Sequence, residues 1–444
     1  MQRELIVYLD VDEKPVLIGR LWARVRSGRA SSSFIYDDAW RTNRSAFALS
    51  PELPLSRGQF HTDRPLFTAF TDSAPDSWGQ KLMRRYERAR AEQEGRDPRT
   101  LFDVDFLAGV DDRTRMGATR FKDLSGDVFL TTRGEPIPPL IDLSVLLGAS
   151  DRIDRGRETN NDVALVLAPG TSLGGARPKA TVRDRDGRLL VAKFPKRDDD
   201  WPVTRWEAIT LAMAEKAGIT VPTWRVETVA RKTVLLLRRF DRLGANLRVP
   251  YMSAMTALNA IDHGEQRSYL ELADVLRQQG SMPESDLKQL WRRIIFNVLV
   301  SNTDDHLRNH AFLRDARGWR LAPAFDMNPC PLDVKQRIHA LAINEVDATA
   351  SIDTALGVAH QFGLARDEAS QIAAEVAAAV AKWRAVAKTH KLKPAEIERM
   401  SSAFEHDDLR QALRDATIKI PSKVTKKSKK TKKRASARVT QQVN

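Results

Sequence analysis

Alternating hydrophobic and polar positions at the start of the chain predict a small antiparallel sheet. In three short segments, hydrophobic residues recur at alternate positions, as in strands with one buried face. These segments are residues 4–9, 15–21 and 33–36. A helical period of three to four residues replaces the alternation over residues 77–94. Its hydrophobic stripe consists of Trp78, Leu82 and Tyr86.

The middle of the chain, from Val163 to Arg242, reads as strands with one helix. Two apolar runs flank the Asp-Arg-Asp-Gly turn of residues 184–187, which is a strong hairpin signal. The expected elements are strands at residues 180–182, 189–194 and 233–237 and a helix at residues 206–216.

Helical periods dominate the second half. A helix is expected to open at Pro283 and to run to about residue 300, directly before a polar segment. A second long helix is expected over residues 367–388. The pattern is therefore α/β (α+β), with a β-rich N-terminal part and an all-helical C-terminal lobe. Our expected divisions are residues 1–125, 126–245, 246–415 and a basic tail at 416–444.

Composition adds two constraints. Ten Lys or Arg residues and no acidic residue lie between positions 419 and 444, so only +4 of the net charge of +14 belongs to the rest of the chain. The tail is either a solvated, disordered segment or a loose contact to nucleic acid or another polyanion. Cys330 is the only cysteine, and no apolar run approaches the ~20 residues of a membrane span. We expect a cytoplasmic protein without a membrane partner.

The polar segment after the Pro283 helix carries the most specific motif. Asp304 is followed by four residues and then Asn309, and Asp326 comes seventeen residues later. Phosphoryl-transfer enzymes of the protein-kinase type use this spacing for a catalytic base and two metal ligands. A hairpin at residues 311–321 would return Asp326 to the other two, and their oxygens suit Mg²⁺. Asp305 competes with Asp304 for the role of base, and His306 either orders the loop or carries a proton.

A glycine-containing segment and a lysine could supply the groups that bind the phosphates of a nucleotide. Residues 171–179 are either a plain turn or a loop whose backbone N–H groups cover phosphates. The candidate contacts in it are Ser172, Gly174, Gly175, Ala176 and Lys179. Lys193 lies in an apolar strand and needs an anion. Glu207 is either its partner or an acid that stabilises a helix N-terminus.

These motifs, in this order, resemble the HipA family, the Ser/Thr kinase toxins of bacterial type II toxin–antitoxin modules. The resemblance extends to about residue 415 and includes the Arg-Phe-Asp-Arg run at 239–242 and the Pro-Asp-Ser run at 75–77. It implies a bilobal protein-kinase-like fold related to the phosphoinositide kinases. The lysine-rich tail lies outside the family pattern.

The resemblance also implies roles for individual residues. Asp304 falls at the catalytic base and Asn309 and Asp326 at the metal ligands, with His306 in the same catalytic loop. The implied nucleotide contacts are Ser172, Gly174, Gly175, Ala176, Lys179, Lys193, Glu207, Arg239 and Phe240. Ser172 falls at the position where family members autophosphorylate and silence the kinase.

The implied cofactors are ATP and Mg²⁺. The implied partners are a helix-turn-helix antitoxin of the HipB type, through it operator DNA, and a protein substrate, which in some relatives is an aminoacyl-tRNA synthetase. Two alternatives stay open: a small-molecule phosphotransferase, because antibiotic kinases share the Asp-to-Asn spacing, and a non-catalytic module that holds an antitoxin on DNA.

Overall fold

The computed structural model describes residues 2–130, 137–170, 175–244, 247–261 and 264–418. The first unit is built on a five-stranded antiparallel sheet in the order β4-β3-β2-β1-β5. Its strands are β1 Gln2–Val11, β2 Lys14–Arg26, β3 Arg29–Tyr36, β4 Gln59–Thr62 and β5 Thr119–Asp123. Three short helices accompany the sheet: α1 Asp38–Arg41, α2 Thr68–Thr71 and α4 Asp103–Gly109. Leu5, Val7 and Leu9 of β1 are fully or almost fully buried, so the predicted alternation does select the core face.

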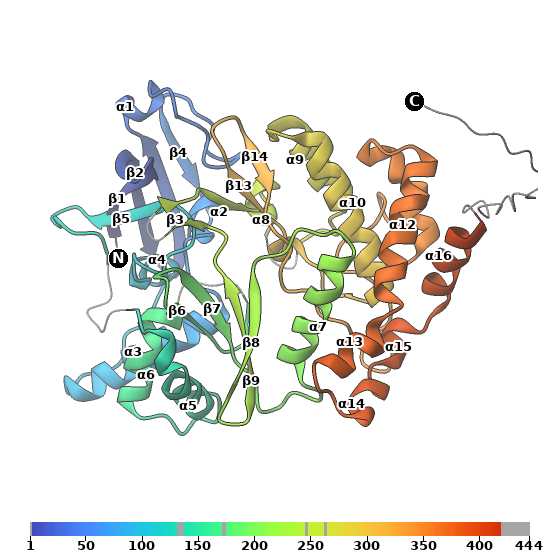
Figure 1. Ribbon diagram of the computed structural model, residues 1–444. Helices are drawn as coiled ribbons and strands as arrows, with labels where there is room; N and C mark the ends of the chain where they lie inside the picture. Colours follow the sequence, from blue (N-terminus) through green and yellow to red (C-terminus); the bar gives the residue numbers. More distant parts are fainter. Residues whose placement is uncertain (1, 131–136, 171–174, 245–246, 262–263, 419–444) are drawn as a thin grey trace, which may run out of the picture.

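A second, four-stranded antiparallel sheet stands at the centre of the molecule (Figure 1). Its order is β6-β7-β9-β8. The strands are β6 Lys179–Arg183, β7 Leu189–Lys193, β8 Trp224–Val229 and β9 Lys232–Arg238. Helices surround it: α3 Ser77–Gln93, α5 Leu143–Asp154, α6 Asn160–Gly170 and α7 Val203–Lys216. The hairpin predicted around residues 184–187 is the β6–β7 pair, in which Lys179 lies opposite Lys193.

Helices make up most of the remaining chain, on the right of Figure 1. They are α8 Ala254–Ala257, α9 Tyr269–Gln279, α10 Pro283–Val300, α11 Ile352–Gly357, α12 Arg366–Val380, α13 Trp383–Thr389, α14 Pro394–Glu398, α15 Ser401–Phe404 and α16 Asp407–Ile418. The helix expected at Pro283 is α10, which begins with Pro283 and ends at Ser301 in a left-handed conformation. The polar motif follows it directly, as predicted.

This lobe is not entirely helical, which corrects one expectation. A three-stranded sheet of β12 Tyr251–Ser253, β13 Ala311–Arg314 and β14 Trp319–Leu321 lies within it, beside the short pair β10 Arg242–Leu243 and β11 Leu247–Arg248. The hairpin expected at residues 311–321 is the β13–β14 part of this sheet. Strand β12 is contributed from before α10, a long-range pairing that local periodicity does not reveal.

Three further details differ from the sequence prediction. The apolar run that begins at Val163 is helical, because short apolar runs fit a strand or a buried helix equally and here α6 packs on α3 and α5. The helix expected over residues 367–388 is divided into α12 and α13, and Trp383 at the start of α13 stacks on Phe404. Tyr86 is exposed, because α3 buries Met83 with Trp78 and Leu82 instead.

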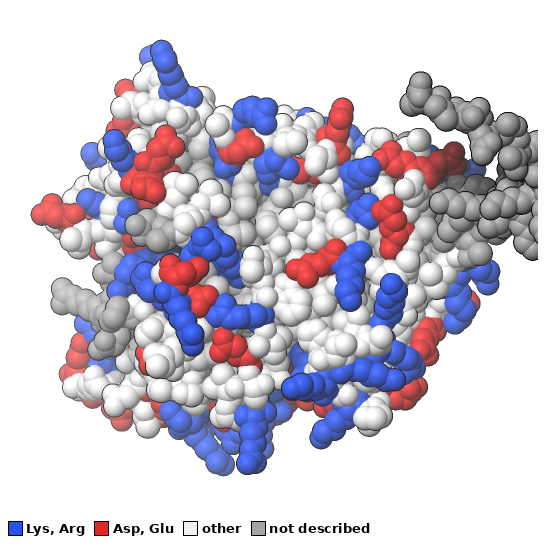
Figure 2. Space-filling view, viewed as in Figure 1, with Lys and Arg blue, Asp and Glu red and all other residues white. Residues whose placement is uncertain are grey.

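The buried hydrophobic residues form three clusters, one at the five-stranded sheet, one at the four-stranded sheet and one in the helical lobe. Helix α3 belongs to the cluster of the central sheet, although it lies inside the predicted unit 1–125. The domain limits given above stay a prediction. Within the described residues, no helix combines the length and apolar character that crossing a bilayer requires. On the face in Figure 2, Lys and Arg side chains are interspersed with Asp and Glu.

Candidate active site

The side chain of Lys193 contacts two carboxylates, those of Glu207 and Asp326. Its Nζ lies 2.6 Å from Glu207 Oε1 and 2.7 Å from Asp326 Oδ1. Lys193 ends β7, Glu207 lies in the first half of α7, and Asp326 follows β14. The side chains of Lys193 and Glu207 are 12% and 4% exposed. A buried ammonium is thus paired with two carboxylates, one from α7 and one from the segment after β14.

The charges in this cluster stabilise one another. Burial by itself would lower the pKa of Lys193, but the carboxylates of Asp326 and Glu207 outweigh it and raise that pKa above its usual value. Burial would raise the pKa of Asp326, yet the ammonium of Lys193 holds it below its usual range. For Glu207 burial dominates and its pKa is raised. Lys193 therefore stays charged at neutral pH, as a phosphate-binding lysine must.

Asp326 adopts an uncommon backbone conformation, with φ of +60°. Aspartate tolerates the left-handed region better than most residues, and such strained residues gather at functional sites. The turn places the Asp326 carboxylate against Lys193 rather than leaving it in solvent.

Lys179 provides a second buried ammonium next to the first. Its Nζ donates to Asp76 Oδ2 at 2.7 Å and to the carbonyl of Gly175 at 3.0 Å. Asp76 also caps the N-terminus of α3 by accepting from Gly79 N–H at 2.7 Å. Burial lowers the pKa of Lys179 and raises that of Asp76, which shows that burial outweighs their attraction. Lys179 and Asp76 therefore form a buried ion pair that borders the cavity.

The glycine segment is only partly described, since Ser172 and Gly174 lie outside the described residues. Gly175 has φ of +105°, where only glycine is unstrained. A Cβ at this position would lie 3.2 Å from Lys179 Nζ and 3.9 Å from Asp326 Oδ2. Gly175 and Ala176 therefore border the same charged cluster, as a phosphate-covering loop would.

The structure distinguishes Asp304 from Asp305. Asp305 is buried and accepts hydrogen bonds from Asn297 Nδ2 at 2.8 Å and His310 Nε2 at 2.7 Å, and also from the Tyr269 hydroxyl. All three hydrogen bonds go to Asp305 Oδ2 and tie the loop to α9, α10 and His310. The Asp304 side chain is 82% exposed and can reach an external hydroxyl. The spacing to Asn309 and the family resemblance favoured Asp304 over Asp305, and of the two only Asp304 is accessible.

Asn309 and His306 complete the loop. Asn309 lies in a 3₁₀ turn, Leu307–Asn309, and its Nδ2 donates to the Asp304 carbonyl at 3.1 Å. This bond uses the amide nitrogen and leaves the amide oxygen for a ligand. His306 Nδ1 is buried and finds no hydrogen-bond partner among the described residues. Both side chains border the cavity described next.

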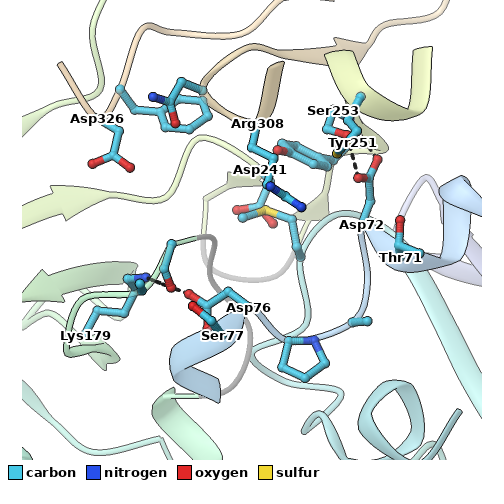
Figure 3. Close-up of a pocket in the computed structure, with 18 of the residues that line it drawn as sticks. Thr71, Asp72, Asp76, Ser77, Lys179, Asp241, Tyr251, Ser253, Arg308 and Asp326 are labelled. Atoms are coloured by element: carbon cyan, nitrogen blue, oxygen red, sulfur yellow. Dashed lines mark hydrogen bonds and ion pairs between the residues drawn. The ribbon is translucent and has the colours of Figure 1, made fainter. Parts of the chain in front are cut away.

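A cavity of about 800 Å³ is bordered by Lys179, Lys193, His306, Asn309 and Asp326. One part is lined by Val191, Leu237, Phe240 and Phe325, whose two phenyl rings are 5.5 Å apart. This apolar slot next to the paired lysines could accommodate a purine. The cavity continues toward the first unit, where Figure 3 shows the Lys179–Asp76 pair near one end and Asp72 bonded to Ser253 near the other.

Arg239 borders the cavity, but its guanidinium is bound by other protein groups. Its guanidinium donates to Asp241 at 2.7 and 2.9 Å and to the carbonyl of Arg115 at 3.1 Å, and it also binds the carbonyl of Thr114. Arg239 is 3% exposed, so its charge is committed to anchoring the 114–117 loop of the first unit. Of the predicted pair, Phe240 is the one with its side chain available to a nucleotide.

Two residues escaped sequence reasoning. Asp76 entered the sequence analysis only within the Pro-Asp-Ser run, and nothing in the sequence signals that Lys179, about a hundred residues later, shares its carboxylate. Asp241, in the Arg-Phe-Asp-Arg run, binds Arg239, Arg242 and Gly117 N–H. The Arg-Phe-Asp-Arg run could have suggested a buried ion cluster, but it does not show that the cluster binds the 114–117 loop.

The ligand set suits a metal that keeps most of its own waters. Asn309 and Asp326 offer oxygens to the same cavity, and among the described residues no three His, Cys, Asp or Glu side chains form a cluster that could hold an ion alone. Mg²⁺ is commonly bound through one or two protein oxygens together with water and substrate phosphates. The residues present therefore fit Mg²⁺ bound together with a nucleotide, rather than a closed metal site.

Two family models match the chain. The HipA N-terminal domain matches residues 9–104, and the HipA-like C-terminal domain matches residues 171–383. Together they span more than half of the chain. The chain belongs to the HipA family. Both matched regions contribute to the cavity, since Asp76 lies in the first and Lys193 and Asp326 in the second.

Individual relatives of this HipA family member are distant. A Sinorhizobium fredii protein named "Putative kinase Y4mE" is 25% identical over 180 residues, which are 35% of this chain and 41% of that protein. The chain thus matches less than half the length of this curated relative. HipA of Shewanella oneidensis MR-1, solved with HipB and its operator DNA, is 17% identical with a TM-score of 0.63. The alignment covers 93% of this chain and 97% of that HipA, and the kinase-like bilobal fold predicted from the sequence is confirmed. The Helicobacter pylori kinase CtkA gives a TM-score of only 0.42 at 14% identity, over 54% of this chain and 94% of CtkA.

Proposed function

We propose that this HipA family member is an ATP-dependent Ser/Thr protein kinase and acts as the toxin of a toxin–antitoxin pair. The observation that carries the proposal is the convergence of Lys193, Glu207 and Asp326 within 2.7 Å. A lysine paired with a helix glutamate and facing a metal-binding aspartate is the arrangement that protein kinases need for phosphoryl transfer.

The residues divide the work as follows. The slot at Phe240 and Phe325 holds the adenine, and the ammonium groups of Lys193 and Lys179 bind the phosphates. Asp304 accepts the proton of the acceptor hydroxyl. The hydroxyl oxygen forms a bond to the γ-phosphorus of ATP while the bond between that phosphorus and the β–γ bridging oxygen breaks. Bound between Asn309, Asp326 and the phosphates, Mg²⁺ would neutralise charge that develops on the phosphoryl oxygens.

The exposure of Asp304 favours a protein acceptor over a small molecule. The carboxylate is 82% exposed and is not among the residues that line the cavity, whereas Asn309 and Asp326 are. A small acceptor would be expected to meet its base inside the enclosed space. A hydroxyl on a protein surface can instead approach Asp304 from solvent while ATP fills the cavity.

Further parts of the proposal rest on one relative, for the antitoxin and DNA, and on the family resemblance, for the substrate and Ser172. The Shewanella HipA was solved with HipB and operator DNA, so we propose a HipB-like helix-turn-helix antitoxin and, through it, operator DNA as partners. An aminoacyl-tRNA synthetase is the substrate class to test first. Ser172 is proposed as a site of autophosphorylation that silences the kinase.

Incubation with γ-labelled ATP and Mg²⁺ tests the activity. Wild type should incorporate label, with Ser172 as one product identified by mass spectrometry, and chelation of Mg²⁺ should stop it. Asp304→Asn should reduce incorporation at least a hundredfold. Asp12→Asn, which removes an exposed charge from the β1–β2 turn, is the matched control and should leave incorporation unchanged. Labelling that survives Asp304→Asn would refute the assignment of the base.

A further inference from the structure

The segment Cys330 to Ala340 is attached at both ends to the loop that carries Asp304. Cys330 N–H donates to the carbonyl of Ser301, and Ala340 N–H donates to the carbonyl of Thr303, each at 3.1 Å. Nine residues between these two anchors form an excursion that starts and ends beside the proposed base. We call residues 330–340 the apron.

Lys335 brings the apron to Asp304 itself. Its Nζ donates to the carbonyl of Thr303 at 3.1 Å and lies 3.8 Å from Asp304 Oδ1. The side chain of Lys335 is 44% exposed, so the pair stands at the surface. A protein surface whose hydroxyl reaches Asp304 would therefore lie next to the apron.

Three aliphatic side chains of the apron are open to solvent. Leu332 is 45% exposed, Val334 49% and Ile338 48%. Single exposed aliphatic residues are common, but here three occur within seven positions, interspersed with exposed polar residues, in the segment whose Lys335 lies beside Asp304.

The apron is held in place from behind. The Arg337 guanidinium donates to the carbonyl of Val298 at 2.8 Å and pairs with Asp408 of α16. Leu332 N–H donates to Ser402 Oγ at 3.1 Å, and Val334 N–H to the carbonyl of Pro331 at 3.0 Å. A surface whose backbone is fixed in this way loses little conformational entropy when it binds a partner.

We propose that the apron is the docking surface for the acceptor segment of the protein substrate, and that it selects an aliphatic side chain near the phosphorylated hydroxyl. The proposal rests on the proposed kinase function. Val334 is the neighbour of Lys335, and consecutive Cα atoms are about 3.8 Å apart. An extended acceptor segment with its hydroxyl at Asp304 would therefore place a residue one to three positions away against Leu332, Val334 or Ile338.

Positional-scanning peptide mixtures with one fixed Ser or Thr, labelled from ATP and Mg²⁺, provide the test. Wild type should prefer Ile, Leu or Val at one or more of the three positions on one side of the hydroxyl. Val334→Asp should abolish that preference and raise the KM for the best peptide at least tenfold, with the KM for ATP unchanged. Leu332→Ser, which adds no charge, should raise the peptide KM about threefold or more. The matched control is Ile141→Asp, an aliphatic residue that is 86% exposed in the 140–142 turn, and it should change neither value.

The outcomes separate this inference from the function on which it rests. If wild type labels itself but shows no aliphatic preference, or if Val334→Asp and Leu332→Ser keep the wild-type peptide KM, the docking proposal is overturned and the kinase function stands. If wild type incorporates no label into itself or any peptide, the function fails as well. Equal melting temperatures of the variants and wild type would show that a raised KM reflects docking.

Discussion

Replacement of Lys193 by methionine is the most informative single change to the proposed site. It keeps the length of the side chain and removes the ammonium that lies 2.6 and 2.7 Å from two carboxylates. Removing one partner of a buried ion pair costs about 3–5 kcal/mol, because the other charge stays buried without compensation. The Asp326 side chain is 32% exposed and water can reach it, so we expect the lower limit, about 3 kcal/mol at pH 7. For domains of this size that corresponds to a fall in melting temperature of roughly 6 °C or more.

The pH dependence of this loss provides a second check. In the variant, burial without the ammonium raises the folded-state pKa of Glu207 further above its unfolded value of about 4.3. A carboxyl group with a raised folded-state pKa destabilises the folded protein as the pH rises above the unfolded pKa. The difference in stability between the variant and wild type should therefore shrink on acidification from pH 7 to pH 5. The double variant Lys193→Met/Glu207→Gln removes one stranded charge and should recover part of the loss. Thermal scans of all three proteins at both pH values suffice. A melting temperature equal to wild type at pH 7, or a larger difference at pH 5 than at pH 7, would refute the reasoning.

Three other predictions concern stability and activity together. Burial raises the pKa of Asp72 to about 6, so the stability of wild type relative to Asp72→Asn should fall by about 1 kcal/mol between pH 5 and pH 7, measured by urea unfolding. Asp241→Asn leaves the Arg239 cluster short of its central anion and should cost about 3–5 kcal/mol, seen as a lower melting temperature and faster proteolysis. Asp305→Asn should lower the melting temperature, because Asp305 is buried and hydrogen-bonded. Asp304→Asn should change stability by less than about 0.5 kcal/mol and still abolish labelling. A loss of stability in Asp304→Asn would contradict the exposed position of Asp304.

The sequence predicted those parts of the molecule whose signals are local. The Pro283 start of α10 and the turn between β6 and β7 depend on neighbouring residues, and both are present as expected. The relation between Asp304 and Asn309 is likewise local, because one loop and one 3₁₀ turn connect the two residues. Such features are fixed by propensity, capping and turn chemistry.

The parts that the sequence did not predict depend on contacts between distant residues. Whether Asp304 or Asp305 is accessible depends on Tyr269 and Asn297, which lie on other helices and fill the three-dimensional surroundings of Asp305. The position of Arg239 depends on a loop more than a hundred residues earlier. A sequence pattern shows that a charged residue needs a partner, but it does not show which partner the fold supplies.

These long-range contacts make the first unit part of the active site rather than an appendage. Asp76 at the start of α3 neutralises Lys179, and Trp78 of the same helix donates to the carbonyl of Lys179 at 3.2 Å. If the first unit moved away, Lys179 would lose the carboxylate that holds its ammonium group, and the cavity would lose the lining that Asp76 and Ser77 contribute. A partner that displaced the first unit would therefore weaken nucleotide binding without touching Lys193, Asn309 or Asp326.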